Sequence, residues 1–590
     1  MKLIIRPLVV LALALGLSLT GAPARAAAPL NVSGHVTDSV TGLPIKDVCV
    51  TVGPPIRCWG GFGTNPGLHT DAAGFYFIDF DAVAASPGSQ WDMYFLKTGV
   101  YDMKYSGKFV VSGPTIIDIQ MTKSPLPPGQ CQATTAPTQI TYLPNITRTL
   151  GGPLGWDTPF YVQNAGSAAT DVEASFYAFD TGALIACHRT AALAAGKSLL
   201  EDPNAAGDLP DNRQFSVVVR SYGAATFATV NQTQSVGGKL QALSYSGFAA
   251  GATKVFVPNV TRKFFGFDVP LIIQNVGSSS ATITATFVSN DGSLTVPFNR
   301  VIAPGLSAVI DPDSDDLTLG APGLRDGTQY AVTVTSSQPI AVVANAHNEA
   351  IGPLAYSHNG LAAGATTVYG PWATKSAALF SNVVVQNLGP TATTATLMFT
   401  PISGAAAQTF TTASIPAGGG FAFDVRYANG IAIQSAALCG SVASATCLGD
   451  GDYALTVTAA QPIAAVVLPN SNTLLDAYVG LASPTAKALL PVVERNFGGW
   501  NSTLWLQSTS ATTATLNFNP IGAGAAVPVT ISLTAGLTKK VDAATIAGLA
   551  NGQQYSVVIT ADGTIAVVVQ ESNLAPGDGL MVHTGFAQLR

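Results

Sequence analysis

Charged side chains are scarce in this sequence. Asp, Glu, Lys and Arg make up 10% of the 590 residues, whereas 47% of the residues are hydrophobic. Surface helices of soluble proteins carry a charged outer face, so this scarcity argues against a helix-rich protein. The formal net charge is −6 and there is no basic run, which excludes the positive surface that nucleic-acid binding requires.

The sequence also lacks the short motifs of common catalytic sites. It contains no G-x-S-x-G, no H-E-x-x-H and no phosphate-binding G-x-x-x-x-G-K-[ST], and its six histidines have no ligand spacing. The acidic run 311–316 lacks the Gly and Glu of an EF-hand; we interpret it as a solvated turn, with another kind of calcium site as the alternative. We expect no enzyme activity, no cofactor and no metal, although carboxylates that meet only in the fold stay open.

The N-terminus predicts export. Lys2 and Arg6 precede an apolar segment, residues 8–19, and Ala24-Arg25-Ala26 is a cleavage site of the A-x-A type. The apolar segment is shorter than the ~20 residues that cross a bilayer, and no later segment is long enough. The prediction is a signal peptide over 1–26 and a secreted or cell-surface-associated protein that does not span the membrane.

Cysteines number only six, and in an exported chain they favour disulfides over metal ligation. None has the C-x-x-C spacing of redox catalysts. Short spacing predicts two of the pairs and elimination gives the third: Cys49–Cys58, Cys439–Cys447 and Cys131–Cys187.

Residues 27–122 alternate and turn like a small β-sandwich. Three turn motifs mark this segment: Gly34-x-Val36-x-Asp38, Thr41-Gly42-x-Pro44-Ile45 and Asp71-x-x-Gly74-x-Tyr76. The motifs resemble those of the carboxypeptidase regulatory-like, or transthyretin-like, family. The resemblance implies a seven-stranded sandwich that accompanies other domains, is often suspected of binding carbohydrate and has no peptidase activity. A Pro-rich linker over 123–138 predicts an extended connection.

The rest of the chain is one unit repeated four times, over 139–252, 253–365, 366–486 and 487–590. Each copy has an opening proline and, on its second strand, a glutamine: Pro144 and Gln163, Pro258 and Gln274, Pro371 and Gln386, Pro491 and Gln507. Strict alternation follows the glutamine, as in Ala281, Ile283, Ala285 and Phe287. About seven strands per copy predict immunoglobulin-like repeats, and hence an all-β chain of tandem β-sandwiches.

A tyrosine opens a late strand in three copies. Tyr330, Tyr453 and Tyr555 each follow an Asp-Gly or Asn-Gly turn. This pattern resembles the tyrosine corner of immunoglobulin-like sandwiches. Phe215 takes the place in the first copy and lacks the hydroxyl.

Two polar positions recur in the repeats and are candidate ligand-binding positions. A cation follows the opening proline by four residues in every copy: Arg148, Arg262, Lys375 and Arg495. An acid or amide precedes the glutamine by six residues in three copies: Asp157, Asp268 and Asn501. The functional hypothesis is a repeated anion or sugar site; the alternative, which we favour, is a loop-bracing ion pair such as Arg148–Asp157.

Aromatic side chains in loops are the other candidates. Trp156, Phe267 and Trp500 stand just before the acid or amide, and Trp59 follows Cys58 in the first domain. An exposed Trp ring can stack on a sugar, but an aromatic residue at a fixed register more often caps a hydrophobic core.

These patterns predict a non-catalytic structural or adhesive protein, extracellular and shaped as a monomeric rod of end-to-end sandwiches. Short linkers such as 249–253 favour the extended shape. The alternative is a carbohydrate-binding protein that uses the N-terminal domain or the Trp-bearing loops, with polysaccharide or surface proteins as partners. An enzyme would require carboxylates clustered in one copy alone.

Overall fold

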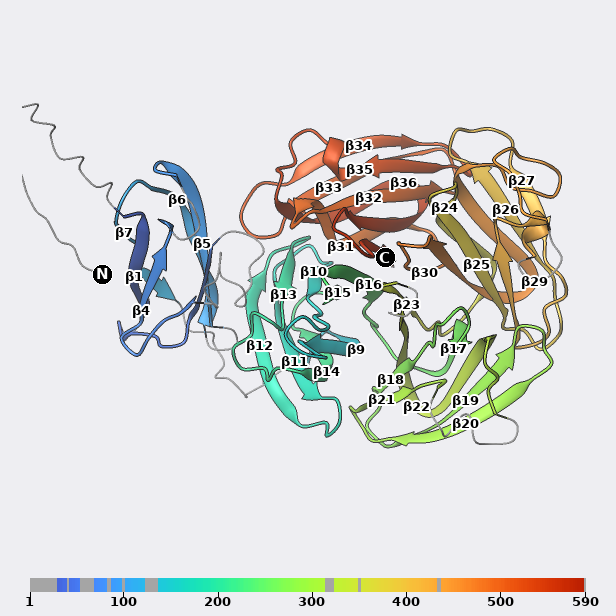
Figure 1. Ribbon diagram of the computed structural model, residues 1–590, viewed down its shortest axis with the longest axis horizontal. Helices are drawn as coiled ribbons and strands as arrows, with labels where there is room; N and C mark the ends of the chain where they lie inside the picture. Colours follow the sequence, from blue (N-terminus) through green and yellow to red (C-terminus); the bar gives the residue numbers. More distant parts are fainter. Residues whose placement is uncertain are drawn as a thin grey trace, which may run out of the picture.

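The computed structural model describes residues 29–39, 42–52, 68–81, 86–97, 101–121, 136–313, 323–348, 352–431 and 437–587. Within these ranges the regular structure is β-strand apart from two single-turn 3₁₀ helices, η2 (Ala428–Gly430) and η3 (Ala543–Thr545). The strands build a small N-terminal sandwich and four larger sandwiches (Figure 1). The predicted all-β class with tandem sandwiches is therefore confirmed, whereas the predicted signal segment lies outside the described residues.

The N-terminal sandwich consists of two four-stranded sheets. One sheet contains β1 (Asn31–Asp38), β4 (Phe75–Asp79), β7 (Thr115–Ile116) and β8 (Ile119–Met121). The other contains β2 (Cys49–Val52), β3 (Leu68–His69), β5 (Ser89–Lys97) and β6 (Tyr101–Val111). Val32, Val36, Met93 and Phe95 are fully buried between the two sheets.

Two glycines of the N-terminal turn motifs are required by close backbone contacts. A Cβ on Gly34 would lie 1.9 Å from the carbonyl oxygen of Ile117. Gly74 has φ +71°, and a Cβ there would lie 2.5 Å from the carbonyl oxygen of Val36. The Asp71 carboxylate accepts hydrogen bonds from the backbone N–H groups of Ala73 and Phe75, which closes the same turn.

The first repeat has two separate four-stranded sheets. One contains β9 (Gln139–Arg148), β11 (Thr170–Ala178), β12 (Leu184–Leu193) and β14 (Arg213–Ser221). The other contains β10 (Phe160–Asn164), β13 (Ser198–Glu201), β15 (Thr226–Val236) and β16 (Lys239–Ser246).

The other three repeats have larger sheets built on the same plan. Repeat 2 contains β17 (Ala252–Arg262), β18 (Leu271–Asn275), β19 (Ala281–Ser289), β20 (Thr295–Ile302), β21 (Ser307–Ile310), β22 (Thr328–Asn348) and β23 (Leu354–Asn359). Repeat 3 contains β24 (Ala365–Lys375), β25 (Phe380–Asn387), β26 (Ala395–Pro401), β27 (Gln408–Thr411), β28 (Gly420–Asp424), β29 (Gly451–Asn470) and β30 (Tyr478–Val479). Repeat 4 contains β31 (Thr485–Phe497), β32 (Trp500–Ser508), β33 (Thr512–Pro520), β34 (Val527–Leu533), β35 (Thr538–Asp542), β36 (Gln553–Asn573), β37 (Leu580–Thr584) and β38 (Phe586–Ala587).

In each of these three repeats one long strand runs from one layer of the sandwich into the other. The first part of β22 pairs with β17 and β19, and its second part pairs with β18 and β23. β22 runs through Pro339 as one strand. In repeat 1 the same path is interrupted between β14 and β15. A strand that changes sheets is a common way to turn the corner of a sandwich.

The alternating strand after each marker glutamine has the predicted orientation. Ala281, Ile283, Ala285 and Phe287 of β19 are completely buried, and the residues between them are partly or fully exposed. The matching apolar residues of repeats 3 and 4 are equally buried: Ala395, Leu397, Phe399, Ala514, Leu516 and Phe518. Period-two patterning therefore sets the inner face of each sandwich.

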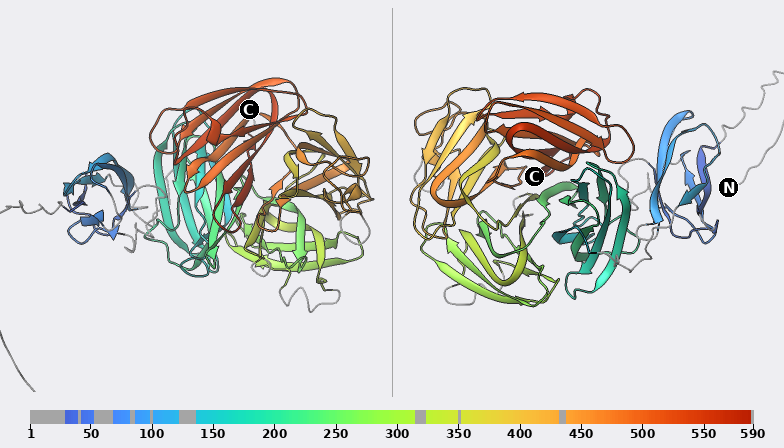
Figure 2. Two further views of the ribbon diagram at one scale, coloured as in Figure 1. Left: turned by 45° about the horizontal axis from the view of Figure 1, so that its top comes forward. Right: turned by 180° about the vertical axis from the view of Figure 1, so that it is seen from behind.

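The four repeats form a closed ring, not the extended rod that the sequence predicts (Figures 1 and 2). Their last major strands, β16, β23, β30 and β37, lie next to one another around the centre of the ring. Repeat 4 hydrogen-bonds to repeat 1, for example from Gln163 Nε2 to the Val557 carbonyl at 3.2 Å. The rod prediction was wrong because linker composition limits the reach of a chain but not the contacts between the domains it joins.

We expect X-ray scattering from a chain of residues 27–590 to show a compact particle. A globule of this length has a radius of gyration of about 24 Å, whereas five sandwiches end to end, each ~33 Å long, give about 45 Å. The protruding N-terminal sandwich will raise the value somewhat above that of a globule. A radius near the rod value would contradict the closed ring.

Candidate functional site

The recurring cation is a buried brace in repeat 1. The Arg148 side chain is 7% exposed, and its guanidinium donates to the carbonyl groups of Ala206 and Leu209. Its Nε lies 2.9 Å from Oδ1 of Asp211, which stands at the turn before β14. These contacts tie the opening strand to the loop that precedes the late strand.

Repeats 2 and 4 contain the same brace. Arg262 Nε donates to Asp326 Oδ1 at 2.7 Å, and its Nη1 lies 3.0 Å from Asp313 Oδ1. Arg495 Nη1 donates to the carbonyls of Ile546 and Leu549, and its Nε donates to Asn551 Oδ1 at 3.1 Å. Because these donors are engaged within the repeat, the geometry favours bracing over an anion site.

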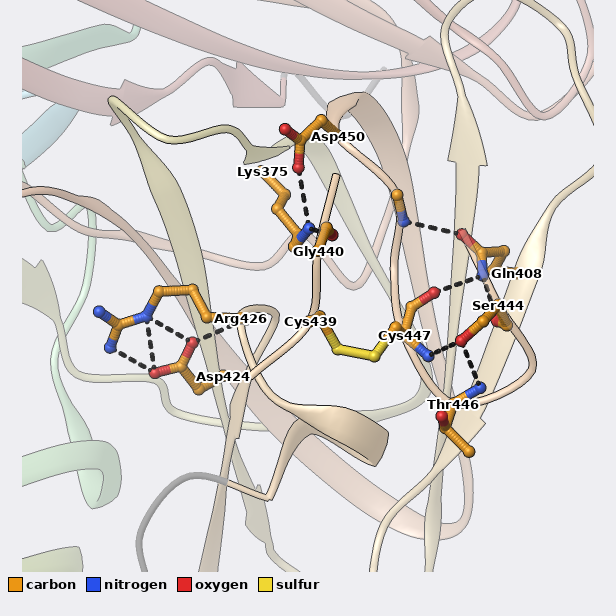
Figure 3. The surroundings of a disulfide bond; sticks show 11 residues. Lys375, Gln408, Asp424, Arg426, Cys439, Gly440, Ser444, Thr446, Cys447 and Asp450 are labelled. Atoms are coloured by element: carbon orange, nitrogen blue, oxygen red, sulfur yellow. Dashed lines mark hydrogen bonds and ion pairs between the residues drawn. A yellow bond between two sulfur atoms is a disulfide. The ribbon is translucent and has the colours of Figure 1, made fainter. Parts of the chain in front are cut away.

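Repeat 3 builds the brace with its disulfide loop (Figure 3). Lys375 Nζ donates to the Gly440 carbonyl at 2.7 Å and lies 2.8 Å from Asp450 Oδ1. The Cys439–Cys447 disulfide holds this loop, and Gln408 Nε2 donates to the carbonyl of Cys447. The shorter lysine thus receives its acceptor carbonyl from an inserted, cross-linked loop, and its carboxylate from Asp450 in the turn before β29.

The acid or amide before each marker glutamine has a different role from the predicted one. Arg148 pairs with Asp211, so the expected pair Arg148–Asp157 is wrong. In repeat 2, Asp268 Oδ1 accepts from the backbone N–H of Lys263, whose φ is 46°. Asn501 does the same for Asn496 in repeat 4. The side chain stabilises a left-handed turn, because it satisfies the N–H that the turn exposes.

The aromatic candidates lie in different surroundings. Trp156 is half-buried, and its ring centroid lies 5.9 Å from that of His347 in repeat 2. Phe267 lies 5.8 Å from Tyr356 of its own repeat. Trp500 is half-buried at the start of β32, with its backbone paired to Asn573. Trp59 lies outside the described residues, so its role stays a prediction.

The tyrosine corners are confirmed in the three copies that have the tyrosine. Tyr453 donates to the Gly449 carbonyl at 2.7 Å. The hydroxyls of Tyr330 and Tyr555 accept from the N–H groups of Arg325 and Ala550, at 2.7 and 2.6 Å. Each bond closes the corner four or five residues upstream.

Three of the four marker glutamines join neighbouring repeats, a role that the sequence analysis missed. Gln386 Nε2 donates to the Val332 carbonyl of repeat 2, and Gln507 Nε2 to the Leu455 carbonyl of repeat 3, both at 3.2 Å. Gln163 makes the matching bond to repeat 4. Gln386 and Gln507 therefore contact the preceding repeat and Gln163 contacts the last, whereas both side-chain polar atoms of Gln274 in repeat 2 are buried without a hydrogen-bond partner among the described residues. Such head-to-tail contacts close into a ring when the rotation between units allows it.

Two of the opening prolines also lie at contacts between repeats. Ser307 Oγ donates to the Pro144 carbonyl at 3.3 Å, and Thr538 Oγ1 donates to the Pro371 carbonyl at 2.7 Å. Recurrence of proline and glutamine in all four copies was the available signal. It did not distinguish a contact within a repeat from a contact between repeats.

Asp476 joins all four repeats at the ring centre. This carboxylate of repeat 3 is fully buried and accepts from Ser357 N of repeat 2 at 3.1 Å. It also accepts from Val582 N of repeat 4 at 2.6 Å and from Ser244 Oγ of repeat 1 at 3.4 Å. Burial raises the pKa of Asp476 well above its ordinary value, while these backbone N–H groups act in the opposite direction.

Asp578 is a second buried carboxylate at the centre. It accepts from Ala355 N of repeat 2 and Leu475 N of repeat 3, each at 3.0 Å. Its own N–H donates to the Leu240 carbonyl of repeat 1. We call Asp476 and Asp578 the hub carboxylates. Between the central strands a cavity leaves room for about one water molecule; its lining includes Tyr245, His358, Tyr478 and His583.

A buried histidine in repeat 1 is held between two carboxylates. His188 Nδ1 lies 3.0 Å from Glu201 and its Nε2 lies 3.1 Å from Asp208. Burial lowers the pKa of His188, but the two carboxylates outweigh burial and raise it to about 10. At neutral pH this imidazole already carries its second proton, so it cannot accept one as a general base.

The predicted disulfides are described in part. The Cys439–Cys447 pair is confirmed. Cys49 and Cys187 are each in a disulfide, but Cys58 and Cys131 lie outside the described residues, so those two pairings stay predictions.

The structure bears on a metal site and on a membrane span only within the described residues. Among them no group of His, Cys, Asp and Glu has the arrangement of a metal site. Asp313 of the acidic run contacts Arg262 and Lys263, while Asp315 and Asp316 lie outside the described ranges. No helix in the described part of the chain is long and apolar enough to cross a bilayer.

No family model matches this chain, and no curated protein is significantly similar to it. Among solved structures, Thermotoga maritima 1070 is 21% identical over 19% of this chain and 94% of its own, with a TM-score of 0.16. BcpA, the major pilin subunit of Bacillus cereus, is 10% identical over 54% of this chain and 87% of its own, with a TM-score of 0.11. A tetra-tandem repeat of a large adhesion protein is 13% identical over 71% of this chain and 92% of its own, with a TM-score of 0.09. Scores this low support no inference about function.

We expect Arg148→Met to destabilise the protein by about 2–4 kcal/mol, because the buried acceptors of the brace lose their donor. Urea unfolding of the mature chain measures this effect. The matched control is Arg213→Met in the same repeat, since Arg213 forms an exposed pair with Asp180 and should change stability by less than ~0.5 kcal/mol. Equal losses in both variants would contradict the brace.

We expect Asp476→Asn to weaken the ring by roughly 1–3 kcal/mol, because the amide NH₂ would face an N–H or O–H donor where an acceptor is needed. Thermal unfolding should show the loss, and limited proteolysis should show earlier cleavage between repeats. Asp180→Asn, at an exposed position, is the control. A wild-type melting profile for Asp476→Asn would mean that the hub carboxylate does not hold the repeats together.

Proposed function

We propose that this chain is an exported, non-catalytic adhesive scaffold whose ring of four sandwiches presents the N-terminal sandwich. One observation carries the proposal: the polar positions that recur in the repeats are engaged in braces and inter-repeat contacts, while an apolar face of the N-terminal sandwich stays exposed. The disulfide of repeat 3 is in keeping with an oxidising, extracellular location. The domain boundaries and the carboxypeptidase regulatory-like assignment of residues 27–122 are part of this proposal.

The exposed face lies on the sheet of β1, β4 and β7. Phe77 is 47% exposed and Ile116 is 76% exposed, and both pair in register with Ser33 on the strand between them. Phe75 lies next along β4 and is 37% exposed. We call Phe75, Phe77 and Ile116 the apolar face. Neighbouring exposed apolar side chains of this kind are typical of interaction sites.

The apolar face points away from the ring. Cys49 and Leu96, on the opposite sheet of the N-terminal sandwich, pack against Ala205 of repeat 1. In Figure 1, β5 and β6 accordingly lie nearer the ring than β1, β4 and β7. The ring therefore leaves the face accessible to a large partner.

Carbohydrate binding is the second candidate function, and the same face favours it over the tryptophan loops. Trp156 and Trp500 are half-buried, and Trp156 packs beside the next repeat. Phe75 and Phe77 are the more exposed rings, and aromatic rings can stack on sugars. His35, beside Phe75, adds a polar group to the face.

We expect a Phe77→Ser/Ile116→Ser variant to bind cell surfaces or wall polysaccharide at least tenfold more weakly than the wild-type mature chain, because the apolar contact area is removed. Surface adhesion and a glycan screen, run together, measure this effect and distinguish a protein partner from a sugar. Val301→Ser is the control, since Val301 is 65% exposed on repeat 2. Unchanged adhesion by the double variant would contradict the proposal, as would hydrolysis of a bound polysaccharide.

A further inference from the structure

The contact between repeats 4 and 1 is the only one of the four ring contacts that joins repeats not consecutive in the chain. We call it the seam. It involves β10, β15 and the turn before β13 of repeat 1 with β31 and β36 of repeat 4, and β16 with β37 at the ring centre. Besides the Gln163 bond, Lys197 Nζ donates to the Pro520 carbonyl at 2.9 Å and Ser556 Oγ donates to the Gly196 carbonyl at 2.8 Å. No linker joins repeat 4 directly to repeat 1, so the seam is held by non-covalent contacts, which include the hydrogen bond from the Asp578 N–H to the Leu240 carbonyl.

Two carboxyl groups are buried at the seam. Glu571 is fully buried, and its Oε2 accepts from Asn231 Nδ2 of repeat 1 at 2.8 Å. Glu494 is 3% exposed, and its Oε1 accepts from Gln554 Nε2 at 2.8 Å. The same Gln554 Nε2 reaches the Tyr161 hydroxyl of repeat 1. Both acids therefore take part in the contact between the two repeats, one directly and one through a shared amide.

No Lys or Arg in the described ranges forms an ion pair with Glu494 or Glu571. Arg495, next to Glu494, is engaged by carbonyl groups and Asn551, and Lys197 also donates to carbonyls. The titratable groups that face the pair are His583, whose Nε2 lies 3.0 Å from Glu571 Oε1, and Tyr161, which is also influenced by Asp202. The pair thus lacks a compensating positive charge.

The electrostatic surroundings favour protonated carboxyls. Burial raises the pKa of Glu571 to about 8. Burial and the neighbouring Glu571 raise the pKa of Glu494 well above its ordinary value. Burial lowers the pKa of His583 to about 4, so this histidine is neutral near pH 7.

In the other three repeats an uncharged residue takes the place of Glu494. The residue before the brace cation is Glu494 in repeat 4 but Thr147, Thr261 and Thr374 in the other repeats. At the contact between repeats 3 and 4, the Trp372 and Trp505 rings stack with centroids 5.2 Å apart. That contact, formed by β24 and β32, is an internal comparison for the seam.

We propose that the seam is a proton-operated joint, closed while Glu494 and Glu571 hold at least one proton between them and open when both carboxyls are ionised. In the open chain the two carboxyls are exposed to water, and their pKa is near the ordinary value of about 4.3. The pKa of each carboxyl is higher in the closed ring than in the open chain. The closed ring is therefore most stable at pH values below the ordinary pKa, and it loses stability as pH rises. The loss should extend from about pH 4.5 through about pH 8, the value that Glu571 has in the closed ring.

Hydrogen–deuterium exchange of the mature full chain between pH 6 and pH 8.5, corrected for the intrinsic exchange rate, tests this joint. We expect the opening equilibrium of seam amides in β10 and β31 to rise at least tenfold, because the closed form binds more protons than the open form. Amides of β24 and β32 should show a smaller rise, because the hub carboxylates join all four repeats whereas the two glutamates lie at the seam. Glu494→Gln/Glu571→Gln should remove most of the pH response at the seam.

An equal pH response at the two contacts would overturn the proposal, and so would an undiminished response in the glutamine variant. If the double variant fails to fold, the same exchange measurement on Glu494→Gln alone, together with the comparison of the two contacts in the wild-type chain, still tests the proposal. Asp180→Asn, an exposed change in repeat 1, should leave the wild-type response unaltered. Adhesion is not part of this measurement, so failure of the joint and failure of the adhesive function are distinguishable.

Discussion

The free backbone edges of the four central strands determine the architecture of the ring. Each of β16, β23, β30 and β37 pairs with its own sheet on one side and faces the ring centre on the other. An unpaired edge in water invites association with other strands, and an unpaired edge buried without partners is costly. The hub carboxylates resolve this conflict, because Asp476 and Asp578 accept the N–H groups of Ser357, Val582, Ala355 and Leu475. Each repeat therefore supplies acceptors or donors that another repeat needs.

The outer edges of the ring are protected differently. β20 and β34 are terminal strands of their sheets and contain Pro297 and Pro528 at matching positions opposite β19 and β33. Proline cannot donate a hydrogen bond to a further strand, so it blocks extension of the sheet. Central edges that bind one another, and the proline-containing outer edges of repeats 2 and 4, favour a closed assembly.

The four repeats share one plan, and a few residue differences among them make the contacts of the ring differ from one another. The brace is retained in all four copies, although in repeat 3 Lys375 takes the place of Arg and a disulfide loop supplies the acceptor carbonyl. The contact plan is also retained, yet one contact contains stacked tryptophans and the seam contains two carboxyls without a cation. Hydrophobic stacking is indifferent to pH, whereas buried carboxyls respond to it. Contacts of equal geometry can therefore differ in what opens them.

The sequence by itself determined the all-β class, the inward faces of the strands, the tyrosine corners and the Cys439–Cys447 disulfide. These features depend on residues close together in the chain: period-two alternation, a turn followed by tyrosine, and two cysteines with a sequence separation of 8. The sequence also located positions that form the brace and the contacts between repeats, since the prolines, glutamines and cations recur in register. Only the tertiary structure decided that Gln163 meets Val557 and that Arg148 pairs with Asp211 instead of Asp157. Ring closure depends on complementary surfaces hundreds of residues apart, and local periodicity contains no information about which surfaces meet.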